Sequence, residues 1–398
     1  MRTAPPAPTG RLLHARRQLR AELAQVVCAL VGLGLGVLMP RLASGPGMQG
    51  SRLVEPLMTL GIGVIGVVSL IYSLLFGVVQ WSASSFSPRL RLFRGDPLVW
   101  RTFALAIGVF VYCAAAALTS ADQTHVSVLV PGVAIAGVLA TVALIRQLQV
   151  RAFLSLQLAY VLEAVTTAGR AVIEDVYPVR SAGRTNVVGR PLAPPALVRT
   201  VTWSGRSEVV QQLDLLDLID SAAEAGALVA FRVGVGETVH EGTPIADIHG
   251  GDVPGDVVRR AVVLGAERSF DQDPMLAIRL LADIALRALS PAINDPATAI
   301  DAIEATDGLL RALARRDIDV RDVTDSGGAI RIRLKLPTWD DYLRGALADL
   351  VPPAAPFEMV LVRLRRLLEN LAEMVPPSAQ DELARLQARV NARLAQPL

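Results

Sequence analysis

The chain has 398 residues, of which 52% are hydrophobic and only 19% are charged. Soluble domains carry about 25% charged residues, so this composition excludes an ordinary soluble enzyme. The formal net charge is +2. A balance this close to neutral argues against a nucleic-acid partner, because nucleic-acid-binding proteins carry strongly basic surfaces. The two cysteines, Cys28 and Cys113, lie in apolar segments and are too few for a disulfide framework or a cysteine-rich metal site.

Four apolar segments near the amino terminus are each long enough to cross a bilayer, which takes about 20 helical residues. Their interiors contain no charged residue. The first segment follows a basic tail, as a signal peptide does, but Pro40–Ser44 is a poor cleavage site, so we expect a retained anchor. The expected spans are Leu23–Met39, Leu57–Val79, Thr102–Ala121 and Val126–Ile145.

The distribution of arginines predicts the orientation of these spans. Loops on the cytoplasmic side of a membrane carry an excess of arginine and lysine. One side of the four spans holds only Arg41 and Arg52. The other side holds Arg2, Arg11, Arg16, Arg17, Arg20, Arg89, Arg91, Arg94, Arg101, Arg146 and Arg151. We therefore expect a multi-pass protein of the bacterial inner membrane with both termini in the cytoplasm.

Two further patterns concern the spans and the lipid around them. The connection at 82–101 alternates apolar residues with arginines, so we expect an interfacial segment whose Arg89, Arg91 and Arg94 contact lipid head groups. Gly32 and Gly36 form a GxxxG pattern, which favours close helix packing, either within the bundle or between two copies.

The uncharged spans also limit the transport mechanisms that the chain can use. Ion-coupled carriers need ionisable side chains inside the membrane, so a carrier is disfavoured. A pore lined by Ser69, Tyr72 and Ser73 of several subunits stays open as an alternative.

The rest of the chain is more polar and predicts a soluble domain. The expected organisation is a transmembrane domain at 1–150, a juxtamembrane helix at 151–177 and a cytoplasmic α+β domain at 178–398. Within that domain we expect a strand over 196–203 and a helix over 208–225. Alternating apolar residues and paired glycines at 227–250 predict short strands that are similar to a barrel-sandwich fold. Such carrier domains present a modified lysine, whereas the first lysine here is Lys335.

The segment 264–300 contains the densest motif, with two Asp-Pro pairs that each predict a helix start. Arg279, Asp283 and Arg287 stand four residues apart on the first helix and predict a ladder of ion pairs. One interpretation places Asp271, Asp273, Asn294 and Asp295 together, beside the arginines, as a site for a divalent cation or an anionic ligand. The other interpretation assigns the aspartates to helix capping. The residue types alone favour capping.

The runs FDQDPMLAIRLLADIALRALSPAINDPATA, SFSPRLRLFRGDPLVWRTFALAIGVFVYC and PTWDDYL resemble a bacterial family of predicted membrane proteins, domain of unknown function 2254. The resemblance extends from about Leu23 to about Leu371. It implies an integral membrane protein and supplies no reaction, substrate or cofactor.

Three functions follow as hypotheses. The first is an oligomeric channel-like or scaffold protein of the membrane with a cytoplasmic regulatory domain. The second is a membrane-tethered ligand or metal sensor, or an assembly factor. The third is a metal-dependent membrane enzyme, which ranks last because no nucleophile lies beside a base. We expect the lipid bilayer and further copies of the chain as partners, and no cofactor beyond a divalent cation at the aspartates.

Overall fold

The computed structural model describes residues 10–42, 46–85, 97–154, 157–180 and 195–396. The chain separates into two compact units. One is Leu12–Tyr160, and the other consists mainly of Val161–Leu398.

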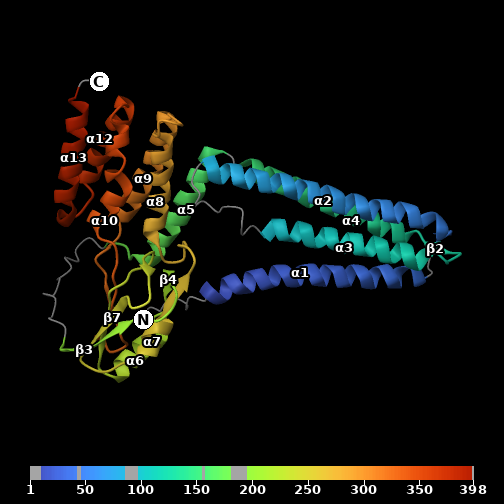
Figure 1. Ribbon diagram of the computed structural model, residues 1–398, viewed down its shortest axis with the longest axis horizontal. Coiled ribbons are helices and arrows are strands. Elements are labelled where there is room, and N and C mark those ends of the chain that lie inside the picture. Colours follow the sequence, from blue (N-terminus) through green and yellow to red (C-terminus); the bar gives the residue numbers. More distant parts are fainter. Residues whose placement is uncertain (1–9, 43–45, 86–96, 155–156, 181–194, 397–398) are drawn as a thin grey trace. The chain divides into compact units, whose positions relative to one another are not determined.

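The first unit is a bundle of four long helices, which lie side by side in Figure 1. The helices are α1 Gly10–Leu38, α2 Ser51–Ser85, α3 Pro97–Ser120 and α4 Leu129–Leu154. Each contains a stretch long and apolar enough to cross a membrane, with a mean hydropathy of 2.0 to 2.2. The prediction of four apolar spans is therefore confirmed.

Helix α3 occupies the centre of the bundle. Half of its spanning stretch (50%) is buried, compared with 17% for α1, 17% for α2 and 22% for α4. The small residues of the GxxxG pattern allow α1 to approach it closely, because a Cβ atom at Gly32 would lie 2.2 Å from the carbonyl oxygen of Gly108. The GxxxG pattern therefore packs within the chain.

The ends of two predicted spans differ from the structure. A short 3₁₀ helix, η1 Met39–Arg41, follows α1. Strand β1 (Gly47–Met48) then pairs with β2 (Val126–Ser127). The fourth helix begins at Leu129 instead of Val126, because Val126 and its neighbour form this backbone pairing.

The second unit contains two sheets. The first has five strands in the order β3-β7-β5-β10-β9, and the second has three in the order β6-β4-β8. Their inward-facing side chains share one core, which includes Val210, Val229, Ile245 and Ile248. The described strands do not close into a barrel, so the barrel-sandwich comparison stays a prediction. The strands are β3 Leu197–Thr202, β4 Glu208–Leu213, β5 Leu228–Phe231, β6 Thr238–Val239, β7 Pro244–His249, β8 Val262–Gly265, β9 Asp322–Thr324 and β10 Ile330–Arg333.

The helix predicted over 208–225 is wrong in its first part. Residues 208–213 form strand β4, which pairs antiparallel with β6 and β8. The helix, α6, covers only Leu216–Glu224 and ends before Gly226, which has a φ of +64°. The helical spacing of apolar residues in α6 extends back to Leu213, the last residue of β4. Local sequence therefore does not mark the boundary between β4 and α6, which depends on pairing with distant strands.

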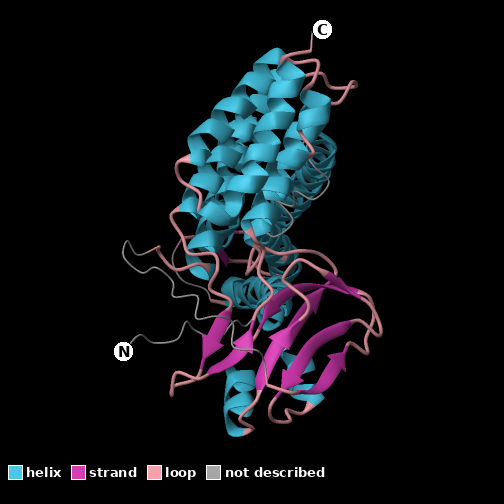
Figure 2. Cartoon of the chain, turned by 90° about the vertical axis from the view of Figure 1, so that its left-hand side faces the viewer, coloured by secondary structure: helices cyan, strands magenta, loops and turns pink. Residues whose placement is uncertain are grey.

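The long helices of the second unit gather at one end, and the strands lie at the other end together with the short helices α6 and α7 Gly255–Ala261 (Figures 1 and 2). Helix α5 packs closely on two of them, because a Cβ atom at Gly169 would lie 2.4 Å from the Cβ atom of Ala277 in α8 and 3.2 Å from Leu309 in α9. These three helices are α5 Leu158–Val176, α8 Pro274–Ala288 and α9 Pro296–Ala314.

The carboxyl-terminal helices complete this layer. Their apolar stripes face one another, so the stripe of Leu383, Leu386 and Val390 is buried within the chain and forms no exposed coiled-coil seam. Ser378 lies inside the 3₁₀ helix η3 and does not cap α13, although its spacing to Asp381 is typical of a helix start. The elements are α10 Trp339–Leu343, the π-helix η2 Arg344–Ala348, α11 Val351–Ala354, α12 Glu358–Ala372, η3 Pro377–Ala379 and α13 Gln380–Leu394.

Candidate functional site

The amino end of α8 is organised by one buried carboxylate, Asp273, whose side chain is 2% exposed. Its Oδ1 atom accepts from the backbone N–H of Leu276 at 3.1 Å, so Asp273 caps the helix. The guanidinium of Arg268 contacts both carboxylate oxygens, with Nε–Oδ2 at 2.6 Å and Nη2–Oδ1 at 2.8 Å. Each oxygen therefore has a donor, and this arrangement describes a structural anchor more closely than a metal ligand.

A glycine and two tyrosines surround this carboxylate. Gly236 has a φ of +88°, and a Cβ atom there would lie 2.6 Å from Asp273 Oδ2. The hydroxyl groups of Tyr177 and Tyr342 lie 2.9 Å apart and share a hydrogen bond. Burial raises the pKa of Tyr177 to about 12 and that of Tyr342 well above its ordinary value. Both phenols therefore stay neutral at physiological pH and do not provide a base.

The second Asp-Pro pair is also a helix cap. Asp295 Oδ1 accepts from the backbone N–H of Thr298 at 3.1 Å, and Oδ2 accepts from its hydroxyl at 2.6 Å. Asn294 before it has a φ of +54°, a conformation that asparagine tolerates well. Both aspartates thus start helices, as the capping interpretation predicts.

The two caps do not meet. Asp273 precedes α8 and Asp295 follows it, so the 15 residues of α8 separate them by about 22 Å at about 1.5 Å per residue. The structure therefore brings Asp273 together with Arg268, and Asn294 together with Asp295, but it does not join the two groups. Asp271 is exposed, and the hydrogen bonds at the start of α8 end on Asp273 instead. A shared ligand for all four residues would need a different arrangement.

Arg279 of α8 has a partner outside the ladder of ion pairs that the spacing suggests. The guanidinium of Arg279 donates from Nη1 to the carbonyl oxygen of Gly345 and to Oδ2 of Asp349, both at 3.2 Å. This contact joins α8 to η2. Asp283 lies one turn further along, partly buried, and Arg287 lies in the last turn of α8. The Nε atom of Arg287 is buried and has no hydrogen-bond partner among the described residues.

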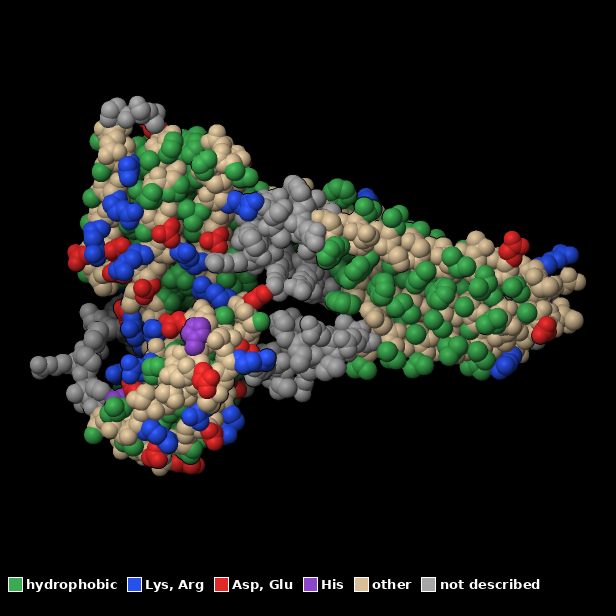
Figure 3. All heavy atoms as spheres, viewed as in Figure 1, with side chains coloured by type: hydrophobic (Ala, Val, Ile, Leu, Met, Phe, Trp, Pro, Cys, Tyr) green, Lys and Arg blue, Asp and Glu red, His purple; other side chains and the backbone are tan. Residues whose placement is uncertain are grey.

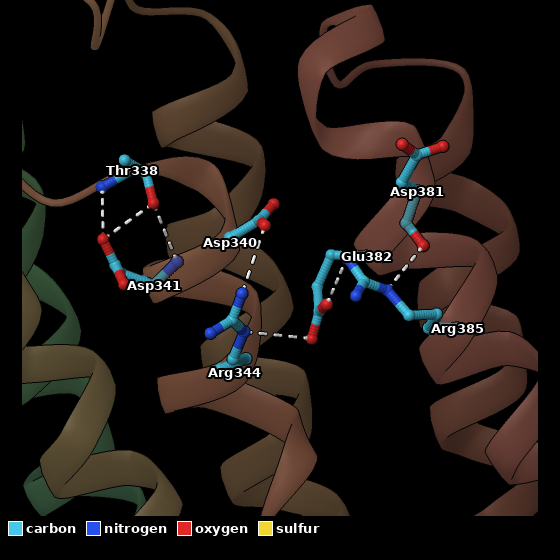
Figure 4. A network of polar contacts seen from close by, with 7 residues as sticks. All are labelled: Thr338, Asp340, Asp341, Arg344, Asp381, Glu382 and Arg385. Carbon is cyan, nitrogen blue, oxygen red and sulfur yellow. Dashed lines mark hydrogen bonds and ion pairs between the residues drawn. The ribbon is translucent and has the colours of Figure 1, made fainter.

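A second polar network joins α10, η2 and α13, and Figure 4 shows it. Arg344 contacts Asp340 at 3.2 Å and Glu382 at 3.3 Å, and Glu382 also pairs with Arg385 at 3.0 Å. Glu382 is 7% exposed, so its two arginine partners offset the cost of burying its charge. The network joins these helices, and each carboxylate oxygen of Glu382 has an arginine partner.

The histidines of the sheet region do not form a metal site. His240 Nδ1 lies 2.8 Å from the hydroxyl of Ser207, and His249 Nδ1 lies 3.0 Å from the carbonyl oxygen of Pro195. Asp247 and Asp252, two carboxylates close to His249 in sequence, pair with Arg232 and Arg199. Within the described ranges, no group of three histidine, cysteine or acidic side chains is placed to hold a metal ion.

The interior of the four-helix unit is closed by packing. The hydroxyl of Thr102 donates to Leu98 O at 2.8 Å, and that of Tyr112 donates to Val130 O at 2.8 Å. Thr141 likewise donates to Gly137 O at 2.9 Å. These buried hydroxyl groups are satisfied within the chain and do not line a polar pathway.

Other predicted membrane residues lie outside the bundle core or outside the described part. Ser69, Tyr72 and Ser73 are exposed on α2 and so do not point into the bundle. Arg89, Arg91 and Arg94 fall outside the described residues, so their contact with lipid head groups stays a prediction.

Sequence reasoning missed Arg268 and the tyrosine pair. Tyr177 and Tyr342 are 165 residues apart in sequence, and no local pattern connects them. Arg268 is five residues before Asp273, outside the helix, where the i,i+4 rule for helical ion pairs does not apply. The buried ion pair of Asp307 and Arg311, at 2.8 Å inside α9, does follow that spacing and was accessible to the same rule.

Comparison with known proteins gives a family match without a described activity. Residues 22–370 match the model of a family described as predicted membrane protein (DUF2254). An uncharacterised protein of Mycobacterium bovis and one of Mycobacterium tuberculosis strain H37Rv are each 27% identical over 397 residues, covering 92% of this chain and 74% of the relative. No solved structure matches the chain.

Proposed function

The chain belongs to the DUF2254 family of predicted membrane proteins, and we propose that it is a membrane-anchored scaffold. In this proposal the four-helix unit holds the α/β unit at the membrane, and the α/β unit binds partner proteins. This proposal takes up the scaffold form of the first hypothesis above and not its channel-like form.

One observation carries the proposal: the four-helix unit has an apolar outside and a packed, apolar inside. Figure 3 shows hydrophobic side chains over most of the visible face of this unit, with most of its charged side chains at one end. Large apolar side chains such as Leu30, Leu70 and Leu139 are more than 60% exposed, as expected for surfaces that contact lipid. A single bundle built in this way anchors and does not conduct.

The orientation is part of the same proposal. Arg146 and Arg151 follow the fourth span, whereas Arg41 and Arg52 lie between the first two. The excess of arginine on the side of Arg146 supports a cytoplasmic α/β unit in the bacterial inner membrane.

A flux measurement on the full chain tests the anchor against the channel. The protein is reconstituted in liposomes loaded with a small fluorescent ion, and release is followed under voltage and under osmotic downshift. We expect no release above that of protein-free liposomes. Release that is lost in a Ser69→Ala/Ser73→Ala variant would instead assign a pore between subunits, because these hydroxyl groups face out of the single bundle.

A cross-linking experiment tests the binding role of the α/β unit. A photo-reactive residue is placed at Ile293 or Met359, which are 49% and 52% exposed, and the exposed turn residue Ser326 serves as a control. The scaffold proposal expects a discrete adduct with a second protein in intact cells from at least one apolar position and none from the control. Absence of adducts at every position would contradict it.

A further inference from the structure

Helices α5 and α9 run side by side in the same direction. A Cβ atom at Gly169 would lie 3.2 Å from a side-chain atom of Leu309, within the two helices. Just beyond their last residues, the backbone N–H of Arg180 donates to the carbonyl oxygen of Arg315 at 3.0 Å. Both helices have 19 residues, so they also begin at the same end of the helical layer.

Helix α12 begins at this end as well. In its second turn, Arg363 contacts Asp307 of α9 at 3.0 Å. The sulfur of Met374, which follows α12, lies 4.0 Å from Arg311 in the last turn of α9. The two helices therefore run in the same direction, and α5, α9 and α12 all begin at one end of the layer.

The connection to α4 keeps the start of α5 close to the membrane. Helix α4 ends at Leu154 and α5 begins at Leu158. Even a fully extended chain of that length covers no more than about 14 Å. The first turn of α5 is thus held near the membrane surface at which α4 ends.

Apolar side chains are exposed where these helices begin. Ile293, in the turn before α9, is 49% exposed, and Met359, in the first turn of α12, is 52% exposed. In Figure 3, hydrophobic side chains cover much of the visible face at the upper end of the layer, where α9 and α12 begin. An apolar surface of this kind is typical of a protein interaction site. The other exposed apolar residues of the two turns are Pro291, Ala292, Pro352 and Pro356.

Unpaired negative charge surrounds these apolar residues. The stretches 158–169, 288–310 and 345–362 contain no arginine, lysine or histidine. Glu163, Asp301 and Glu358 are exposed within them and form no ion pair among the described residues. The arginines nearest to this end on α8 and α13 are Arg287 and Arg393, in the last turns of those helices. The negative charge is therefore concentrated over α5, α9 and α12, where it repels anionic lipid and attracts a basic partner.

We propose that this surface, the acidic tip, binds the cytoplasmic juxtamembrane segment of another membrane protein. The acidic tip consists of Glu163, Ile293, Asp301, Glu358 and Met359. Membrane proteins carry an excess of arginine and lysine directly beside their spans on the cytoplasmic side, next to apolar residues. Such a segment matches the acidic tip in charge and in apolar surface, and it lies at the same membrane surface. The inference rests on the scaffold proposal and names the class of its partner.

Photo-cross-linking of the full chain in lipid nanodiscs tests this surface. A photo-reactive residue replaces Ala297, which is exposed in the first turn of α9. The probe is a synthetic single-span peptide whose flanking segment alternates leucine and arginine. Two control peptides have the same span but a serine–arginine or a leucine–glutamate flank. We expect the leucine–arginine peptide to give a several-fold higher yield of adduct than either control, because the acidic tip needs both apolar and basic side chains.

Charge reversal tests the electrostatic part. Asp301→Lys/Glu358→Lys should lower the yield with the leucine–arginine peptide about fivefold, because two attractions become repulsions. Asp217→Lys/Asp220→Lys makes the same change of charge at exposed positions of α6 and should leave the yield unchanged.

A second pair of variants tests the apolar part. Ile293→Ser/Met359→Ser should lower the yield several-fold. Leu197→Ser/Val198→Ser removes apolar side chains that are 58% and 48% exposed on β3 and should have no effect. Unchanged melting temperatures show that the variants are folded.

Equal yields from the three peptides, or an undiminished yield after the charge reversal, would overturn the inference. So would an adduct from position 297 in intact cells with a soluble protein or with a second copy of this chain. An adduct with a soluble protein would leave the scaffold proposal in place, whereas the absence of adducts from every tested position in cells would contradict the scaffold proposal itself.

Discussion

Asp273 and Asp295 do the same capping task in different surroundings. Asp273 is buried and its carboxylate also pairs with Arg268. Asp295 is half-exposed, and its carboxylate accepts from the hydroxyl and backbone N–H of Thr298 and from the backbone N–H of Ala297. Loss of the first therefore also leaves a partly buried guanidinium without its partner.

This difference predicts an order of stability losses. Asp295→Ala should lower the free energy of unfolding by about 1 kcal/mol, the usual cost of a helix cap. Asp273→Ala should cost about 3 kcal/mol, because it removes a cap and breaks a buried ion pair. Asp271→Ala, at an exposed neighbour, is the control and should have little effect. Denaturant unfolding of the full chain in detergent, followed by circular dichroism, measures the three values. A loss for Asp271→Ala as large as that for Asp273→Ala would contradict the assignment of the buried cap to Asp273.

The cap at Asp295 also predicts a pH effect. The hydroxyl and the backbone N–H of Thr298 donate to its carboxylate and hold the pKa of Asp295 below the ordinary value of 3.8. A carboxyl group with a lowered pKa in the folded state stabilises the fold above its ordinary pKa, and that stabilisation is lost as the pH falls through the folded-state pKa. Asp295→Asn keeps a capping oxygen but does not titrate. The stability advantage of the unmodified chain over Asp295→Asn should be constant near pH 6 and shrink below pH 3.8. An advantage independent of pH would contradict this account.

At the scale of elements, the contact between α1 and α3 depends on the absence of side chains. A Cβ atom at Gly32 would lie 2.2 Å from Gly108 O, and one at Gly36 would lie 2.7 Å from the Cβ atom of Ala115. Neither backbone atoms nor a short Cβ can move aside, so any larger residue separates the helices. Gly34 lies between them in sequence, and a Cβ atom added there would meet no other atom within 4 Å.

The pair Gly32 and Gly34 therefore offers a matched test of helix packing. Gly32→Ala should destabilise the bundle by about 1–3 kcal/mol, the usual cost of overpacking, and lower the melting temperature in detergent. Gly34→Ala makes the same change on another face of α1 and should leave the melting temperature unchanged or slightly raised, because alanine favours helix. Equal effects of the two substitutions would show that α1 does not pack on α3 through this face.

At the scale of the whole molecule, the proposed orientation determines which loops are accessible from outside the cell. Gln49 lies between α1 and α2, and Ser326 lies in an exposed turn of the α/β unit. In a chain without Cys28 and Cys113, a single cysteine at position 49 should react with a membrane-impermeant maleimide in intact cells. A cysteine at position 326 should react only after the membrane is permeabilised. The opposite labelling pattern would place the α/β unit outside and invert the proposed topology.

The sequence by itself determined the features that depend on neighbouring residues. Four long uncharged apolar stretches predict four spans because hydrocarbon tolerates few other sequences of that length. Asp-Pro pairs predict the starts of α8 and α9 because the capping carboxylate reaches an N–H group only three residues away.

Only the tertiary structure decided the features that depend on distant parts of the chain. Residues 208–213 became a strand because β6 and β8 supply backbone partners, although Leu213 continues the helical spacing of the apolar residues in α6. The tyrosine pair brings together residues that are 165 positions apart in the sequence, and the length of α8 keeps the two aspartate caps apart. Local preferences are weak compared with the burial and pairing that such contacts provide, so these arrangements are invisible within a short window of sequence.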